Sequence, residues 1–407
     1  MSQLSFMQKL LDGVAVEWKT LGKVVLPTSN IRWRDTKSTY RYIDLTSVSV
    51  DTKKVAEVSE VNADNAPSRA QKLVEKDDVI FATTRPAQQR YCLIDDEYAG
   101  AVASTGYCVL RAKKDEVMPK WILYGIASTD FKIYVEENQS GSAYPAISDS
   151  KVKEFLIPIP PLHVQAEIVR ILDAFTAVTA ELTAELNTRK KQYNYYRDQL
   201  LSFEEGEVEW KTLGEVANYS KTRINFEQLN TSNYVGVDNL LQNRAGKKES
   251  NYVPTEGNLI KYQRDDILIG NIRPYLRKIW QADRVGGTNG DVLVIHTVDT
   301  RLNSRYLYQV LADDKFFEYN MQHAKGAKMP RGDKEKIMEY KIPIPYADDP
   351  KKSLAEQARI VDILDKFDAL TNSITEGLPR EIALRQQQYE YYRELLLSFP
   401  KPPLTPP

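Results

Sequence analysis

The feature that most constrains this 407-residue chain is an internal duplication. Four segments recur in the same order, with a period near 190 residues. They are VEWKTLG (Val16–Gly22 and Val208–Gly214), IPIP (Ile157–Pro160 and Ile342–Pro345), QAEIVRILDAF from Gln165 with QARIVDILDKF from Gln357, and QYNYYRDQLLSF from Gln192 with QYEYYRELLLSF from Gln388. Chance does not produce four ordered matches of this length, so the chain consists of two homologous halves.

Between each VEWKTLG and its IPIP lies a long stretch that hardly matches its counterpart, apart from short echoes. KDDVIFATTRP (Lys76–Pro86) parallels RDDILIGNIRP (Arg264–Pro274), and GSAYP (Gly141–Pro145) parallels GAKMP (Gly326–Pro330). Alternating runs such as DVIFAT and DVLVIHT predict β-strands. We therefore expect two mainly β modules of one fold, with accessory helices and different surface residues.

A long amphipathic helix is predicted after each IPIP, because apolar residues recur at steps of three, four and seven. In the first half this stripe is Ile168, Ile171, Phe175, Val178, Leu182, Leu186, Tyr193, Tyr196 and Leu200. In the second half it is Ile360, Ile363, Phe367, Leu370, Ile374, Leu378, Ile382, Tyr389, Tyr392 and Leu396. We expect the two helices to bury these coiled-coil-like seams against each other. The alternative is that the seams leave room for helices of a partner.

The start of the chain, MQKLLDGVAVEW, is similar to the end of the first long helix, DQLLSFEEGEVEW. The fold class we expect is therefore α+β: two mainly β domains separated by a pair of long antiparallel helices, with pseudo-twofold circular symmetry. The predicted parts are an N-terminal helical segment (1–15), a first variable domain (16–158), a central helical spacer (159–205), a second variable domain (206–343) and a C-terminal helical spacer (344–407).

Composition excludes several classes of protein. The formal net charge is −1, which argues against a histone-like polyanion binder but allows local basic faces. Cys92 and Cys108 have no metal-ligand spacing and are expected to be free and buried, and the three histidines are scattered, so we expect no metal site. No apolar run is long enough to span a bilayer and no secretion signal is recognised, which predicts a cytoplasmic protein.

The paired LG…IPIP frames, the QxxIVxILD helices and the QYxYYR–LLSF helix ends resemble the specificity subunit of type I restriction-modification systems, and the resemblance covers essentially the whole chain. The tandem TAELTAEL is similar to the type IC branch. The resemblance implies that each variable domain is a target recognition domain for one half of a split DNA site. It implies that the helices dock two methyltransferase subunits, and that motor-nuclease subunits join them for restriction. S-adenosylmethionine, ATP and Mg would then belong to these partners, and this chain would carry no catalytic site.

The residues agree that catalysis is not local. The sequence contains no GxxxxGK[ST] phosphate loop and no Asp/Asn-Pro-Pro-aromatic cluster for adenine methylation. Two Glu-x-Lys triplets, Glu17-Trp18-Lys19 and Glu209-Trp210-Lys211, resemble half of a metal-dependent nuclease site, which needs a further carboxylate. Because both triplets open the repeated frame, we expect a structural role for them.

Base reading requires Arg or Lys for guanine, Asn or Gln for adenine and apolar groups for thymine, whereas phosphate contacts add affinity without specificity. Loops that mix these types are the candidate DNA-binding elements. In the first domain the candidates are Arg32, Arg34, Lys37, Arg41, Thr84, Arg85, Gln88, Gln89, Arg90, Gln139, Ser140 and Tyr144. In the second they are Lys221, Arg223, Asn271, Arg273, Tyr275, Arg277, Lys278, Thr288, Asn289, Lys325, Lys328 and Arg331. About half of such loop residues are expected to be solvated turns without a DNA contact. Arg85 and Arg273 occupy matching positions, so we assign them to phosphate contact or to the fold before base reading.

The tandem comprises Thr179, Ala180, Glu181, Leu182, Thr183, Ala184, Glu185 and Leu186. From Phe175 to Tyr193 is 18 residues, whereas the equivalent Phe367 to Tyr389 is 22, so the first helix is one four-residue unit shorter. In the longer copy, Gly377 and Pro379 are expected to interrupt the helix. We interpret the tandem as an adjustable spacer; in the family that the chain resembles, the number of TAEL units is associated with the gap between half-sites. The alternative is a neutral product of repeat slippage.

Two rival functions remain at this point. One is an interaction scaffold with two β-rich modules on a helical rod that bind proteins rather than DNA. The other is a stand-alone nuclease, which would cleave DNA in the presence of a metal ion. Neither explains why two modules of one fold differ in surface while their frames stay alike.

Overall fold

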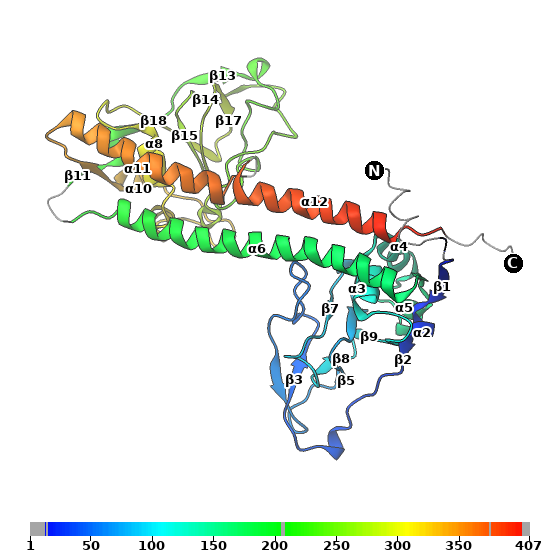
Figure 1. The fold of residues 1–407 in the computed structure, drawn as a ribbon. Helices are drawn as coiled ribbons and strands as arrows, with labels where there is room; N and C mark the ends of the chain where they lie inside the picture. Colours follow the sequence, from blue (N-terminus) through cyan, green and yellow to red (C-terminus); the bar gives the residue numbers. More distant parts are fainter. Residues whose placement is uncertain (1–12, 14, 205–207, 374–375, 401–407) are drawn as a thin grey trace. The chain divides into compact units, whose positions relative to one another are not determined.

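The computed structural model describes residues 13, 15–204, 208–373 and 376–400. The chain divides into two compact units (Figure 1). Unit 1 comprises Met1–Val178 with Arg385–Pro407, and unit 2 comprises Thr179–Leu384. Each unit combines small β-sheets with helices, so the α+β class is confirmed. The predicted N-terminal helical segment, 1–15, lies almost wholly outside the described residues.

The described residues of unit 1 form three sheets. Two have four strands, in the orders β2-β9-β6-β7 and β4-β3-β8-β5, and the third pairs β1 with β10. The strands are β1 (Glu17–Thr20), β2 (Val25–Leu26), β3 (Tyr40–Ile43), β4 (Ser59–Val61), β5 (Ala70–Leu73), β6 (Val79–Ala82), β7 (Tyr91–Leu93), β8 (Val102–Ser104), β9 (Tyr107–Ala112) and β10 (Leu156–Ile159). The helices are α2 (Leu21–Val24), η1 (Trp33–Asp35), η2 (Pro86–Gln88), α3 (Pro119–Ala127), α4 (Thr129–Asn138), α5 (Asp149–Glu154), the start of α6 (Leu162–Leu200) and the end of α12 (Gly377–Leu397).

Unit 2 repeats most of this plan. Its sheets have the orders β12-β18-β15-β16, β13-β14-β17 and β11-β19. The strands are β11 (Val208–Thr212), β12 (Ala217–Tyr219), β13 (Arg223–Asn225), β14 (Asn258–Tyr262), β15 (Ile267–Gly270), β16 (Ile279–Gln281), β17 (Gly286–Thr288), β18 (Val292–Thr297) and β19 (Lys341–Pro345). The helices are the end of α6, α7 (Leu213–Val216), η3 (Phe226–Gln228), η4 (Pro274–Leu276), α8 (Ser304–Leu311), α9 (Asp314–Gln322), α10 (Lys334–Glu339), α11 (Pro350–Thr371) and the start of α12.

The repeated segments form the frame of each unit. VEWKTLG supplies the strand that pairs antiparallel with IPIP, as β1 with β10 and β11 with β19. Every residue of β6 and of β15 is buried, which explains their continuous apolar runs. The Glu-x-Lys triplets lie in β1 and β11, and their lysines form ion pairs with nearby carboxylates. This placement supports the structural role that we expected for both triplets.

A buried glutamine joins the long helix to the β-rich body at the same position in each unit. Gln165 accepts a hydrogen bond from Met118 N at 2.9 Å and donates to Glu116 O at 3.0 Å. Gln357 accepts from Asn303 N at 2.8 Å and donates to Arg301 O at 2.9 Å. Both side chains are fully buried. The shared Gln of the two QxxIVxILD segments is therefore a positioning residue of the fold.

The helix pairing is circular, as expected. In unit 1 the start of α6 packs against the end of α12, and in unit 2 the end of α6 packs against α11 (Figure 1). The seam is covered only in part, because Val178 and Tyr196 remain 41% and 45% exposed. The expected interruption near Gly377 is confirmed, since α11 ends at Thr371 and α12 begins at Gly377. None of the helices in the described ranges is long and apolar enough to cross a membrane.

Candidate nucleic-acid interface

A strained turn follows the buried central strand of unit 1. Arg85 and Gln89 both adopt the left-handed conformation, with φ of 50° each, on either side of η2. Such a conformation costs a non-glycine residue of the order of 1–3 kcal/mol and persists only where neighbouring groups enforce it. Here Arg85 N donates to Pro145 O at 2.7 Å, and Gln89 N donates to Pro86 O at 2.9 Å. We call residues 85–89 the arginine-proline turn of unit 1.

Unit 2 contains the same turn at residues 273–277. Arg273 and Arg277 are left-handed, with φ of 53° and 50°, on either side of η4. Arg273 N donates to Pro330 O at 2.7 Å, and Arg277 N donates to Pro274 O at 2.9 Å. Two turns that share Arg-Pro but differ in their next three residues thus adopt one backbone conformation. Strain that is kept at the same place in both units indicates a functional element.

A second loop closes on each turn. In unit 1, isolated β-bridges join Ala146 to Thr84 and to Ser140; in unit 2, Arg331 is joined to Ile272 and to Lys325. The tips of these loops carry Tyr144 and Met329, which are 70% and 51% exposed. We use the name double loop for residues 84–89 with 140–146 in unit 1 and for 272–277 with 325–331 in unit 2.

Two of the candidate cations fasten the turn rather than face solvent. Arg90 donates to Val48 O at 2.6 Å, and the equivalent Lys278 donates to Val237 O at 2.7 Å. Burial lowers the pKa of Lys278, and burial likewise lowers the pKa of Lys53, which donates to Gln89 O at 2.6 Å. The prediction that Arg90 and Lys278 contact DNA is therefore wrong in this structure, because both side chains hold the turn in place.

Two further candidates are buried. Thr288 is 0% exposed and donates to Val235 O, because Gly286–Thr288 form strand β17 rather than an open loop. Asn271 is 5% exposed at the end of β15, and its Oδ1 has no partner among the described residues. Gly332 lies against it, since a Cβ there would meet Asn271 Oδ1 at 2.8 Å. Because both side chains are buried, neither Thr288 nor Asn271 can contact DNA bound at the surface in this structure.

The other candidates are exposed or half-buried. Several are held by neighbours: Arg34 by Asp35, Arg41 by Glu97, Arg277 by Asp314, Lys325 by Asp333 and Arg331 by Asp291. Those with no ion pair to a described carboxylate are Arg32, Lys37, Arg85, Lys221, Arg223, Arg273 and Lys328. The polar and aromatic candidates at the surface are Thr84, Gln88, Gln89, Gln139, Ser140, Tyr144, Tyr275 and Asn289. The double loops gather Thr84, Arg85, Gln88, Gln89, Ser140 and Tyr144 in unit 1, and Arg273, Tyr275, Arg277, Lys325, Lys328 and Arg331 in unit 2.

The sequence pointed to the double loops but missed some of their members. Ala87 and Met329 are exposed within them, and Lys53 supports the turn through its hydrogen bond to Gln89 O. The echo of GSAYP in GAKMP was the signal for Met329, because it aligns that residue with Tyr144. The role of Lys53 had no sequence signal, since it depends on a contact 36 residues away.

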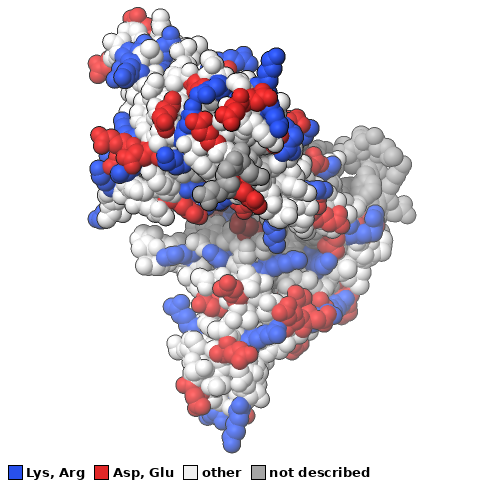
Figure 2. All heavy atoms as spheres, turned by 90° about the vertical axis from the view of Figure 1, so that its left-hand side faces the viewer, with Lys and Arg blue, Asp and Glu red and all other residues white. Residues whose placement is uncertain are grey.

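The charges of the surface are mixed. Figure 2 shows Lys and Arg side chains interspersed with Asp and Glu over the face that it draws. This distribution fits the net charge of −1. On this face, attraction of DNA would therefore depend on single Lys and Arg side chains rather than on one large basic patch. Within the described ranges, no group of three or more His, Cys, Asp or Glu side chains is arranged to hold a metal ion.

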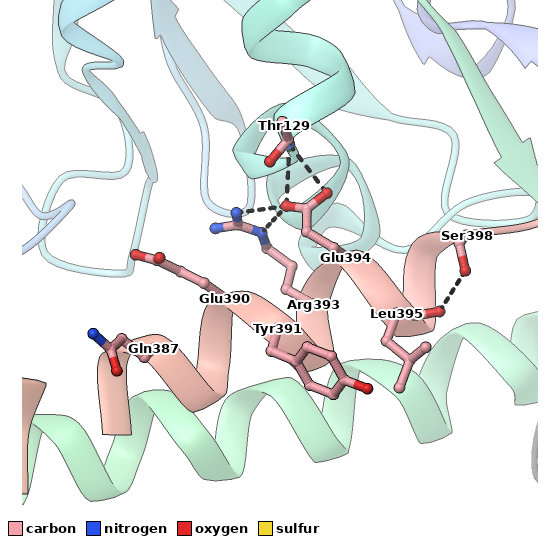
Figure 3. Close-up of a pocket in the computed structure, with 8 residues that line it drawn as sticks. All are labelled: Thr129, Gln387, Glu390, Tyr391, Arg393, Glu394, Leu395 and Ser398. Carbon is pink, nitrogen blue, oxygen red and sulfur yellow. Dashed lines mark hydrogen bonds and ion pairs between the residues drawn. The ribbon is translucent and has the colours of Figure 1, made fainter. Parts of the chain in front are cut away.

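Helix α12 forms one side of a groove of about 620 Å³ in unit 1 (Figure 3). Glu394 accepts hydrogen bonds from Thr129 N at 3.1 and 3.2 Å and is also held by Arg393 (Figure 3). These contacts fix α12 to the first turn of α4, where a carboxylate is favoured. Tyr391 is 62% exposed beside this groove, and its counterpart Tyr195 on α6 is also 62% exposed. The two helices thus present the same aromatic residue at equivalent positions.

Comparisons with known proteins agree with this geometry. The model of the type I restriction modification DNA specificity domain matches residues 29–190 and 205–384. The chain is 36% identical to the EcoR124I/EcoR124II specificity subunit of Escherichia coli, over 99% of both chains. It is 31% identical to a putative type I restriction enzyme specificity subunit of Haemophilus influenzae, over 97% of this chain and 98% of that protein.

Solved structures show the same fold. A chain from a structure of a type I R-M system superposes with a TM-score of 0.56 at 22% identity, over 94% of this chain and 97% of that chain. The type I restriction-modification S subunit from M. genitalium gives a TM-score of 0.58 at 15% identity, over 96% and 98%. The family model and the curated relatives confirm the sequence-based prediction of a type I specificity subunit, and the solved structures confirm its fold. The duplicated frame, the two units and these relatives together show that the chain belongs to the family of type I restriction-modification specificity subunits.

Proposed function

We propose that each unit reads one half of a bipartite, asymmetric DNA site. The observation that carries this proposal is the pair of double loops, in which one backbone frame displays two different sets of exposed side chains. A pair of modules that serves one ligand would keep its surface side chains alike. Two modules that serve different base sequences need a common frame and different surfaces.

Within each double loop the contacts divide into two kinds. Arg85 and Arg273 are shared, exposed and without a carboxylate partner in the described chain, and therefore suit phosphates, which are the same at every site. Side chains that differ between the units, such as Gln88 and Tyr275, suit the base edges. The remaining exposed candidates near these loops add affinity. The weakly negative net charge implies that partner subunits supply much of the sequence-independent affinity.

The partners in this proposal are two methyltransferase subunits, with motor-nuclease subunits added for ATP-dependent restriction in the cytoplasm. The equivalent exposed residues Tyr195 and Tyr391 support the docking of two copies of one protein, since the same aromatic is displayed twice. The product of the smaller complex would be methylated adenine in the target site. S-adenosylmethionine, ATP and Mg would be bound by these partners, and this chain would hold no cofactor.

The TAEL tandem is proposed to set the gap between half-sites. It lies inside the continuous helix α6, at the point where the chain passes from unit 1 to unit 2. Four further helical residues add about 6 Å and a net rotation of about 40°. One base pair turns DNA by about 35° and advances it by about 3.4 Å. An added unit should therefore re-phase the two units by about one base pair, with the extra length absorbed by bending.

A protein-binding scaffold is the rival function, and the family assignment does not favour it. It predicts tight, salt-insensitive protein binding without a DNA footprint. A stand-alone nuclease predicts metal-dependent cleavage by the isolated chain, and the placement of both Glu-x-Lys triplets in the frame strands speaks against it.

The test is a map of methylated adenines in cells that contain this chain and its methyltransferase subunit, with two TAEL units and then three. We expect a split motif whose halves persist while the gap grows by about one base pair. The matched control is Glu181→Gln, which changes the tandem but not its length. A split motif with an unchanged gap would support reading of half-sites by the two units but would reject the proposal that the TAEL tandem sets the gap. No methylation by an assembled, active complex would reject the proposed function.

A further inference from the structure

The arginine-proline turns have the geometry of an interchangeable element. Their backbones agree at both left-handed residues, and the hydrogen bonds that enforce them also agree. Ala82 N donates to Arg90 O at 2.8 Å, and Gly270 N donates to Lys278 O at 2.9 Å, so both turns close on the same strand position. In each unit the turn also lies against the equivalent helix, η2 against α4 and η4 against α9. The frame is therefore independent of the side chains that it displays.

The displayed side chains are concentrated at two positions between the left-handed residues. In unit 1 these are Ala87 and Gln88, both exposed. In unit 2 they are Tyr275, which is 50% exposed, and the half-buried Leu276. The flanking positions have fixed tasks: Pro86 and Pro274 are buried, and Arg90 and Lys278 are fastened to backbone carbonyls.

The two positions differ in chemistry between the units. The Gln88 amide is oriented, because its Oε1 accepts a hydrogen bond from Arg90 Nε at 3.1 Å. Unit 1 therefore presents amide donors, which suit acceptors on the base edges. Unit 2 presents the exposed Tyr275, and its double loop also exposes Met329; such aromatic and apolar side chains suit a thymine methyl group or an open base step.

We propose that the residue pairs 87–88 and 275–276 determine which bases each unit reads, as exchangeable specificity positions in a fixed frame. The proposal deepens the proposed function and rests on it. A preformed turn loses little conformational freedom on binding, so a change of side chain alters base preference without altering the frame. The pair in one unit is expected to act on its own half-site and to leave the other half-site and the gap unchanged.

The experiment exchanges the pairs in the full chain, assembled with its methyltransferase subunit. The first variant is Ala87→Tyr with Gln88→Leu, and the second is Tyr275→Ala with Leu276→Gln. The control is Ala99→Tyr, which makes the same change at an exposed turn of unit 1 outside the double loop. The readout is the map of methylated adenines, with complex assembly measured by size-exclusion chromatography.

We expect each exchange to reduce methylation of the original motif at least tenfold, or to change one half of it, while the complex assembles and the control methylates as the wild type does. Full methylation of the original motif by both exchanged chains would overturn the proposal. If the larger side chains prevent assembly of the first variant, the second variant decides, because it shortens an exposed residue. A wild-type complex that methylates no split motif would instead refute the proposed function itself.

Discussion

The ring of Phe175 stacks on the ring of Tyr392 in unit 1, with centroids 5.2 Å apart and planes inclined by 18°. The equivalent residues of unit 2, Phe367 and Tyr196, stack at 5.4 Å and 25°. In unit 1 the first half of α6 meets the end of α12, and in unit 2 the end of α11 meets the end of α6. Each unit is therefore built from both halves of the sequence. Its β-rich body and one helical segment come from one half, and the helix end that packs against that segment comes from the other half.

This sharing of helix ends between the halves predicts which unit a substitution in a long helix destabilises. Phe175→Ala should destabilise unit 1 by about 1–3 kcal/mol, because a half-buried aromatic contact is lost. Hydrogen exchange should then quicken at the end of α12 while unit 2 stays protected. Phe367→Ala is the matched control and should quicken exchange at the end of α6. Equal effects of both variants on both units would contradict the circular pairing.

A buried carboxylate in unit 1 depends on one arginine. Asp78 is 0% exposed, and Arg111 donates to its two oxygens at 2.9 and 2.8 Å. These hydrogen bonds raise the pKa of Arg111, which stays charged. Arg111→Ala should cost about 3 kcal/mol of unfolding free energy, because it leaves a buried charge unpaired. Urea unfolding followed by tryptophan fluorescence measures this.

Unit 2 provides the comparison, since His296 faces the buried Asp266 at 2.6 Å in the equivalent position. Arg111→His should therefore be tolerated far better than Arg111→Ala. Equal losses from the two substitutions would show that a histidine at position 111 does not replace the hydrogen bonds of Arg111 to Asp78.

The breaks in the frame were predictable, whereas several loop residues were not. Gly377 and Pro379 predict the helix interruption from the sequence alone, because their effects on the backbone do not depend on distant contacts. Thr288 was predicted to lie in a DNA-binding loop but is buried in β17. Gly286 in the same strand is required by a close approach, because a Cβ there would overlap Asn233 O. Arg90 and Lys278 were predicted to be surface cations. Their hydrogen-bond acceptors, Val48 O and Val237 O, lie 42 and 41 residues away along the chain, so the local sequence gave no sign of these contacts.

The helix interruption makes a third stability prediction. Gly377 has φ of +72°, and a Cβ there would overlap Ala369 O and lie 2.8 Å from Leu370 O. Gly377→Ala should therefore destabilise unit 2 by more than the cost of about 1 kcal/mol for a left-handed alanine. The control is Gly257→Ala, which has φ of +88° but no atom within 4 Å. Thermal unfolding should separate the two variants, and equal shifts would mean that the break tolerates a side chain.

The two cysteines report on unit 1 alone. Cys92 and Cys108 are free and fully buried, as expected from the sequence, and burial raises the pKa of each thiol to about 12. A thiol reagent at pH 8 should react with neither in the native protein and with both in denaturant, since the thiolate is the reactive form. Rapid labelling of the native chain would show that the β-rich body of unit 1 opens readily.

The shared arginines predict a specific pattern of DNA binding. Arg85→Ala and Arg273→Ala should each weaken binding of the assembled complex to all DNA sequences alike. Each should also reduce the slope of log affinity against log salt by about 1, because one phosphate contact is lost. The methylated motif should stay the same. Fluorescence anisotropy with a labelled duplex at several salt concentrations measures the slope, and Lys132→Ala, an exposed lysine on α4, serves as the control. A changed motif would assign Arg85 or Arg273 to base reading, and an unchanged slope would remove them from the interface.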